Sequence, residues 1–325
     1  MSTLSLMRGP ARVVVRRYRR PLWTVGALAL AGIAAVVGTY LWTSSVSDTF
    51  AGTGCSAQKV TRGCGDTVRH FLDAEFHFHQ VFAYADLVMM LLPAFIGIFV
   101  AGPVIGRELE SGTYKLSWTQ SVSPARWLAA QLAVPAVLTL AGVSVLSAVC
   151  AWARSKANGM HYTLQWYERV VYGAMGTVPV GYALCMLAFG ALAALVLRRT
   201  VAAMIVTVVA YGALVVALNT VRNSLWPVRT DTFRFGSAYR FPDAAADTGQ
   251  GWITTGGKRL PADVCLNSAD DLKDCLAGHD VAFRYLDYHP ASHFWPLQLV
   301  ETGILLVLAA AAVALAFRVL RRRHG

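Results

Sequence analysis

The sequence predicts an all-α integral membrane protein with six membrane-spanning helices and an external loop region between the fifth and sixth spans. Three observations predict this fold class. Of the 325 residues, 56% are hydrophobic and only 14% are charged, whereas soluble domains average about 25% charged residues. Uncharged apolar runs long enough to cross a bilayer, which takes about 20 residues, recur along the chain. Basic residues gather in short segments beside these runs, as topology signals do.

Residues 1–21 are predicted to be a cytoplasmic basic segment, because they contain six arginines and no acid. The pattern fits either an amphipathic helix lying on anionic lipid or a disordered basic tail. The first span follows from Leu22 to Trp42. Its apolar run exceeds the roughly 7–15 residues of a signal-peptide core, so we expect an uncleaved helix.

Residues 22–219 are predicted to contain spans one to five. A polar loop at 44–86 leads into span two, Leu87 to Ile105, which contains Pro93 and Pro103. Membrane helices tolerate proline because neighbouring groups satisfy the freed carbonyls. Arg198 and Arg199 form a tight turn between spans four and five. Spans three, four and five are Trp127 to Ala153, Val170 to Leu197 and Val201 to Asn219.

Residues 220–296 are polar and rich in Gly, Pro and Asp, which predicts an external loop region before span six at 297–317 and a basic tail at 318–325. Six spans place both termini on one side of the membrane. The termini, the segment 106–126 and the Arg198-Arg199 turn are strongly basic, and their only acids are Glu108 and Glu110. The positive-inside rule therefore predicts a multi-pass plasma membrane protein with cytoplasmic N- and C-termini. This distribution of the net charge of +11 argues against a nucleic-acid partner and for the lipid bilayer.

The six cysteines follow the same topology. Cys150 and Cys185 lie within spans, and the other four form two close pairs in the two external loops. An oxidising exterior favours the disulfides Cys55–Cys64 and Cys265–Cys275. Four free thiols are the alternative, because spacing alone does not fix connectivity.

The segment 106–126 is a short polar stretch between spans two and three. Gly112 stands where a helix would be interrupted, and Ser123 with Pro124 forms a helix start. The segment is either a small ordered element for a soluble partner to contact or a plain connecting loop. Near the start of span six, Gln298 and Glu301 share helical spacing. They are candidates for a translocation path or a helix contact, and an interfacial position of Glu301 is the alternative.

The chain lacks the motifs of several enzyme classes. Gly251 to Lys258 resembles a phosphate-binding loop, but its lysine is out of register and Arg259 replaces the hydroxyl residue. No zinc-protease motif or serine nucleophile elbow occurs, and no acid is expected deep within a span. We therefore predict no catalytic residues, no metal site, no cofactor and no enzymatic activity in this chain.

The run from Gly106 to Trp127 resembles the loop between spans two and three of type-2 ABC transporter permeases, particularly those of actinomycetes. Tyr288-His289-Pro290 and the run His293 to Gln298, followed by Glu301, resemble the entry to the last span of the same group. The six-span layout of the whole chain matches the family plan. The chain departs from the family pattern at two positions. His293 stands where a basic residue is expected, and Gln131 stands where the family often has lysine.

The resemblance implies a permease subunit that pairs with a separate ATP-binding subunit and with a second permease copy, as a homodimer. The segment 106–126 would be the coupling loop that contacts the ATPase and transmits its closure into the spans. Its expected contact residues are Arg107, Glu108, Glu110, Gly112, Thr113, Tyr114, Trp118, Gln120 and Arg126. The implied function is ATP-driven export, and spans rich in Ala, Val and Leu favour an amphipathic or hydrophobic substrate.

A membrane sensor or assembly protein whose external cap binds a ligand is the alternative function. The chain has no cytoplasmic signalling domain, which favours the permease.

Overall fold

A computed structural model describes residues 19–112, 123–156, 165–266 and 271–324. Their contacts divide the chain into two units. The helical unit comprises residues 1–164, 168–216 and 301–325, and the sheet unit comprises residues 165–167 and 217–300. The helices α9 and α11 connect the two units along the chain.

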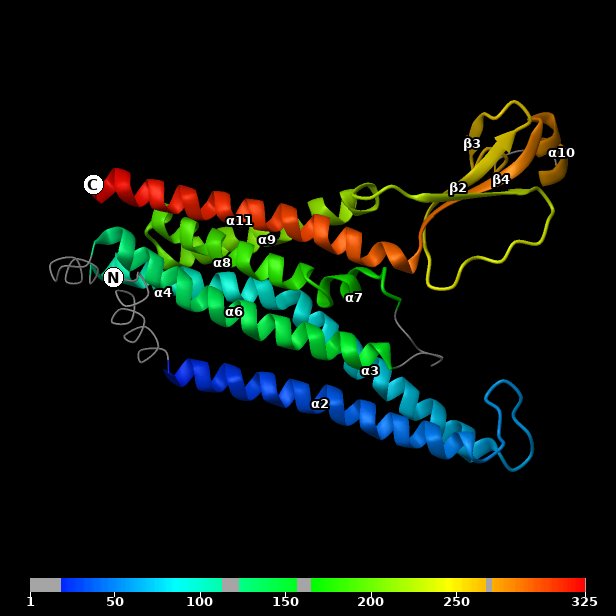
Figure 1. The fold of residues 1–325 in the computed structure, drawn as a ribbon, viewed down its shortest axis with the longest axis horizontal. Coiled ribbons are helices and arrows are strands. Elements are labelled where there is room, and N and C mark those ends of the chain that lie inside the picture. The colour runs from blue at the N-terminus through cyan, green and yellow to red at the C-terminus, as the bar shows by residue number, and fades with distance from the viewer. Residues whose placement is uncertain (1–18, 113–122, 157–164, 267–270, 325) are drawn as a thin grey trace, which may run out of the picture. The chain divides into compact units, whose positions relative to one another are not determined.

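The helical unit is built from long apolar helices that run alongside one another (Figure 1). Across the described residues, six helices are long and apolar enough to cross a membrane. The helices of the chain outside the sheet region are α2 Arg19–Ala51, α3 Gly65–Phe95, the π-helix η1 Ile96–Ala101, α4 Gly102–Ser111, α6 Pro124–Ser155, α7 Arg169–Ala174, α8 Val178–Leu197, α9 Thr200–Val221 and α11 Phe294–His324.

The helical stretch that contains the second predicted span is much longer than its apolar run. The predicted loop at 44–86 is too long, because α2 continues to Ala51 and α3 begins at Gly65, which leaves a connection at 52–64. Together α3, η1 and α4 form a continuous helical stretch of 47 residues. At 1.5 Å per residue this is about 70 Å, more than twice the roughly 30 Å of a hydrocarbon core. Hydropathy therefore identified only the part of the helix that can lie in lipid.

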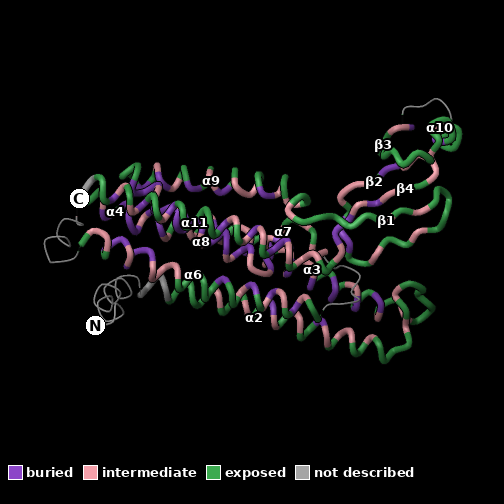
Figure 2. The backbone as a smooth tube through the Cα atoms, turned by 45° about the horizontal axis from the view of Figure 1, so that its top comes forward, coloured by how far each residue is buried: buried purple, intermediate pink, exposed green. Residues whose placement is uncertain are grey.

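The hairpin of α2 and α3 is held at its turn by the Cys55–Cys64 disulfide and by aromatic contacts. Phe50 stacks on Phe71 with their ring centroids 4.2 Å apart. Much of the rest of α2 is exposed in this single chain (Figure 2). The helix α2 is thus attached mainly through one face, to α3 and α6.

The predicted fourth span is two helices. The short helix α7 ends before Gly176, which has a φ of +73°, and α8 then begins with Pro179 in its first turn. A left-handed glycine followed by proline is a strong break in a helix. The long helix that remains, α8, is the most buried of the six candidate spans.

The π-helix η1 lies against α8 through glycine. It follows Pro93, whose missing N–H interrupts the normal ladder of α3. A Cβ at Gly190 would lie 2.5 Å from the carbonyl oxygen of Gly97, so the two backbones are in direct contact. Small residues permit such close approach between membrane helices.

One end of the helical unit brings together several helix ends that carry arginines. A single apolar cluster there joins residues of α4, α6, α8, α9 and α11, including Ile105, Trp127, Leu195, Ala203 and Leu320. The described ends of the segment 106–126 (106–112 and 123–126), the Arg198-Arg199 turn and the last turns of α11 therefore lie at the same end of the bundle.

The sheet unit contains an antiparallel four-stranded sheet with the order β1-β4-β2-β3. The expectation of an all-α chain with only a loop at 220–296 is wrong here. The strands show no regular hydrophobic alternation, because charged residues or glycines interrupt their apolar positions, so the sequence pattern did not indicate strands. The elements are β1 Arg229–Arg234, β2 Ala246–Thr254, β3 Arg259–Pro261, β4 Val281–His289, the helix α10 Leu272–Gly278 and the 3-10 turns η2 Arg222–Ser224 and η3 Ala291–His293.

Two segments cover one face of the sheet. Tyr239 stacks on Phe233 with the ring centroids 4.2 Å apart, and the hydroxyls of Tyr239 and Tyr288 both donate to Asp231. Burial and this hydrogen bond raise the pKa of Tyr239 to about 12. Farther along the sheet, Trp252 packs with the Cys265–Cys275 disulfide segment. Both segments are thereby attached to the same face of the sheet.

Candidate functional site

The candidate site begins at the carboxyl end of α4. The helix ends at Gly112, which adopts a left-handed conformation with φ +70°. Glycine reaches this conformation without the steric cost that a Cβ would add. On the far side of the segment, Ser123 accepts a hydrogen bond from the Arg126 amide at 3.4 Å, and Pro124 opens α6. Both ends of the segment are therefore defined by local sequence.

Glu108 connects α4 to α6. It is buried, and its carboxylate accepts hydrogen bonds from Trp127 Nε1 at 2.9 Å and from Gln131 Nε2 at 3.3 Å. Buried carboxylates require such partners because desolvation is otherwise costly. Gln131, noted from sequence only as a departure from the family, is therefore a direct partner of Glu108.

Glu110 connects α4 to α9. Its Oε1 accepts from the Thr200 amide at 2.7 Å, and its Oε2 accepts from Thr200 Oγ1 at 2.8 Å. Thr200 is the first residue of α9, where unpaired amides and the helix dipole favour a carboxylate. A Cβ at Gly106 would lie 2.8 Å from Thr200 Oγ1, so the two helices are in close contact at this point.

Other residues assigned to the coupling loop lie at the surface or outside the described residues. Arg107 and Arg126 are exposed. Thr113, Tyr114, Trp118 and Gln120 lie outside the described residues. The described part of the site is therefore the base of the segment, where two carboxylates attach α4 to α6 and to α9.

Gln298 and Glu301 are both fully buried. Tyr182 Oη of α8 donates to Glu301 Oε1 at 3.2 Å, and Thr177 and Thr302 form a hydroxyl pair at 2.8 Å. Glu301 thus faces a neighbouring helix. Tyr182 also meets the ring of Tyr211 edge-on, with centroids 6.0 Å apart.

The hydrogen bonds of His289 and His293, in the motif before α11, determine the tautomer of each histidine. His289 is buried, and its Nε2 lies 3.1 Å from the carbonyl oxygen of Asn223, which can only accept. In a neutral His289 the proton is therefore on Nε2, and Nδ1 accepts from Nδ1 of His293 at 3.0 Å. This motif is thus hydrogen-bonded both within itself and to η2 at Asn223.

An ion pair between α3 and α6 was missed by the sequence analysis. Arg154 Nη2 lies 2.5 Å from Oδ2 of Asp86, whose side chain is fully buried. The guanidinium also lies 5.3 Å from the centroid of the Phe82 ring. Asp86 directly precedes one apolar run and Arg154 directly follows another, so both were treated as loop residues. The sequence signal for this pair was that an acid and a base stand at the ends of two apolar runs that face the same side of the predicted membrane.

The structure joins Cys55 to Cys64 and Cys265 to Cys275. His279 lies near the second pair, within the spacing of a three-ligand metal cluster. Because both sulfurs are in a disulfide, this cluster offers no thiolate ligand in the structure.

These features define a multi-pass membrane protein with an ordered polar connection at one end of its helical bundle. A family model described as "ABC-2 membrane transporter related" matches residues 23–222, more than half of the chain. The chain belongs to this family, and its resemblance to type-2 ABC transporter permeases is confirmed. No curated protein and no solved structure matches the chain. The family match ends at η2, so most of the sheet unit and α11 lie beyond it.

Proposed function

We propose that this chain is the membrane-spanning subunit of an ABC exporter, without catalysis of its own, and that a separate ATP-binding subunit drives it. Family membership supports a membrane permease. The observation that supports coupling through 106–126 is the pair of carboxylates at its base. Movement of the segment would pull on α6 through Glu108 and on α9 through Glu110, because each is hydrogen-bonded to the first turns or first residue of that helix.

The proposed topology places the segment 106–126 and both termini in the cytoplasm. The supporting feature is that Arg107, Arg126, the Arg198-Arg199 turn and the basic last turns of α11 lie at the same end of the helical unit, and the positive-inside rule assigns such an end to the cytoplasm. The substrate proposed is amphipathic or hydrophobic and moves outward. A second permease copy completes the transporter as a homodimer.

Changing Glu110 to glutamine tests the coupling proposal. Glutamine keeps the shape of the side chain but removes its negative charge, so the charge-assisted hydrogen bonds with Thr200 at the amino end of α9 become weaker neutral ones. With the permease reconstituted beside its ATPase, we expect ATPase stimulation and transport to fall about tenfold, within the 5–150-fold span of typical couplings. Co-purification of the two subunits is expected to persist.

The matched control is Asp48→Asn, the same loss of charge on an exposed acid of α2. It is expected to leave both activities unchanged. Equal activity of Glu110→Gln and the unmodified chain would refute coupling through Glu110. Failure of any ATPase subunit to bind the unmodified chain would refute the permease proposal itself.

A ligand-binding sensor is the second candidate function, and a pocket in the sheet unit favours it. The pocket holds aromatic, cationic and acidic side chains together. The two functions separate in the same reconstitution, because a sensor would bind its ligand without ATPase-dependent transport.

A further inference from the structure

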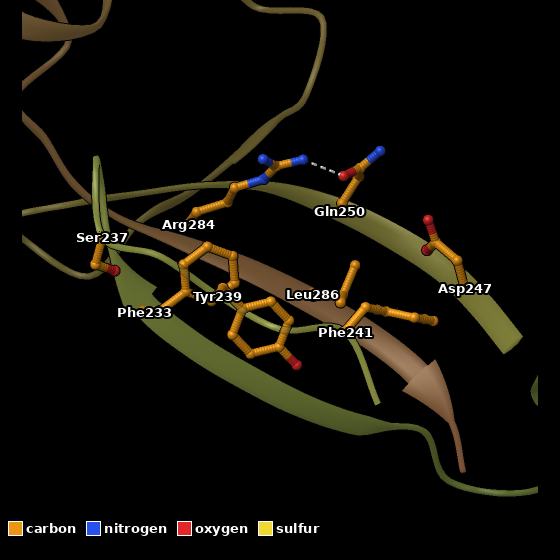
Figure 3. Close-up of a pocket in the computed structure, with 8 residues that line it drawn as sticks. All are labelled: Phe233, Ser237, Tyr239, Phe241, Asp247, Gln250, Arg284 and Leu286. Atoms are coloured by element: carbon orange, nitrogen blue, oxygen red, sulfur yellow. Dashed lines mark hydrogen bonds between the residues drawn. The ribbon is translucent and has the colours of Figure 1, made fainter. Parts of the chain in front are cut away.

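The pocket lies on the covered face of the sheet in the sheet unit (Figure 3). Its volume is 410 Å³, within the range of about 300–1,000 Å³ found for small-molecule sites. The lining residues come from β1, β2, β4 and the segment after β1. They are Phe233, Ser237, Tyr239, Phe241, Asp247, Gln250, Arg284 and Leu286.

An apolar wall occupies the middle of the pocket. Phe233 and Tyr239 stack with an interplanar angle of 4°, and buried Leu286 lies beside them. Phe241 is 38% exposed, which leaves much of its ring open to a ligand. Aromatic side chains of this kind bind apolar groups over a large area without losing much conformational freedom.

Arg284 supplies an anion-binding group. It is half-buried, donates to Gln250 Oε1 at 2.5 Å and lies 5.6 Å from the Trp252 ring centroid. Its partners in the described part of the chain are thus neutral, and no carboxylate pairs with it there. A guanidinium has five N–H donors in a fork that matches a carboxylate.

Asp247 supplies the opposite charge at a distance. One of its carboxylate oxygens accepts from the Gly249 amide at 3.0 Å, and the residue is exposed. In the sheet, Arg284 pairs with Trp252, whereas Asp247 pairs with Tyr288, four residues farther along β4. At about 3.3 Å per residue this separates the two backbone positions by about 13 Å. Figure 3 shows Asp247 toward the other end of the pocket from Arg284.

We propose that this pocket binds a short zwitterionic peptide of two or three residues with an apolar or aromatic side chain. The carboxylate of the peptide binds Arg284, its ammonium binds Asp247, and its side chain lies on Phe233 and Tyr239. Two or three extended residues span about 7–11 Å, which fits the separation once both protein side chains reach inward. A free amino acid, whose two charges are on one carbon, is too short to reach both groups.

The first test is calorimetric titration of the full-length protein in lipid nanodiscs with the tripeptide Ala-Phe-Ala. We expect binding of the tripeptide and at least tenfold weaker binding of free phenylalanine. The amidated tripeptide is also expected to bind about tenfold more weakly, because it lacks the carboxylate for Arg284. Absence of tripeptide binding, or equal binding of the amidated form, would overturn the proposal.

Variants assign each charge to its partner. Arg284→Gln should weaken tripeptide binding about tenfold and should have little further effect on the amidated form. Asp247→Asn should likewise weaken tripeptide binding about tenfold and should have little further effect on the N-acetylated form, which lacks the ammonium group. Arg234→Gln is the matched control, because Arg234 is an exposed arginine on the opposite face of the sheet.

Equal weakening by Arg234→Gln and Arg284→Gln would contradict the assignment. If Arg284→Gln unfolds the sheet unit, the exposed Asp247 variant and the N-acetylated peptide still decide the outcome. The test uses neither the ATPase nor transport, so its result is independent of the proposed permease function.

Discussion

Replacing Gly190 by valine is expected to destabilise the helical unit by about 3 kcal/mol or more, at or above the upper end of ordinary overpacking. The first added carbon would lie 2.5 Å from the carbonyl oxygen of Gly97. That atom belongs to the backbone of η1, so no side-chain rotation can relieve the contact. The reverse contact is also tight, since a Cβ at Gly97 would lie 2.9 Å from the carbonyl oxygen of Met186. Either η1 or α8 must therefore move.

Thermal unfolding in detergent measures this loss through a thiol-reactive dye. Cys150 and Cys185 are free and buried, so the dye reacts with them as the helices separate. Gly142→Val is the matched control, because it places the same side chain in α6, where a Cβ at Gly142 has no atom within 4 Å. We expect a large fall in melting temperature for the first variant and little change for the second. Equal melting of both variants would show that the glycine contact is unimportant for stability.

The apolar runs predicted six helices, but the sequence did not predict where all of them begin and end. The run from Leu87 to Ile105 is the apolar part of a helical stretch that starts at Gly65. Helix residues outside the hydrocarbon need no apolar character, and hydropathy therefore cannot detect them. The break before Pro179 was missed for the opposite reason, because the residues around it are as apolar as the helix that follows.

The candidate site was predicted in part. Local sequence indicated the helix end at Gly112 and the helix start at Ser123, and both occur in the structure. The partners of Glu110 could not be predicted, because Thr200 is 90 residues away in the chain. The resemblance assigned Glu110 to a partner protein, whereas its carboxylate is hydrogen-bonded to α9 of the same chain. Long-range pairing of this kind depends on helix packing, which sequence patterns do not specify.

Replacing Asp86 by alanine is expected to lower stability by about 3–5 kcal/mol, the usual cost of breaking a buried ion pair from one side. The cost arises because the Arg154 guanidinium, 15% exposed, would lose the carboxylate now 2.5 Å from it. The pair is also incompletely satisfied, since Oδ1 of Asp86 and Nε of Arg154 have no hydrogen-bond partner among the described residues. The same thiol-exposure measurement applies. The control Asp243→Ala breaks an ion pair whose two side chains are each 89% exposed, and it should leave the melting curve unchanged.

A double replacement separates the cost of an unpaired charge from the net contribution of the pair. Asp86→Leu combined with Arg154→Met removes both charges and leaves apolar side chains between α3 and α6. Because desolvation offsets much of the attraction in a buried pair, the double variant should regain most of the stability lost by Asp86→Ala. If the double variant is as unstable as Asp86→Ala, the ion pair itself stabilises the fold, and the loss in the single variant is not only the cost of an unpaired arginine. Its geometry would then be required to position α3 against α6, and the same double variant should also lose transport in the reconstituted system.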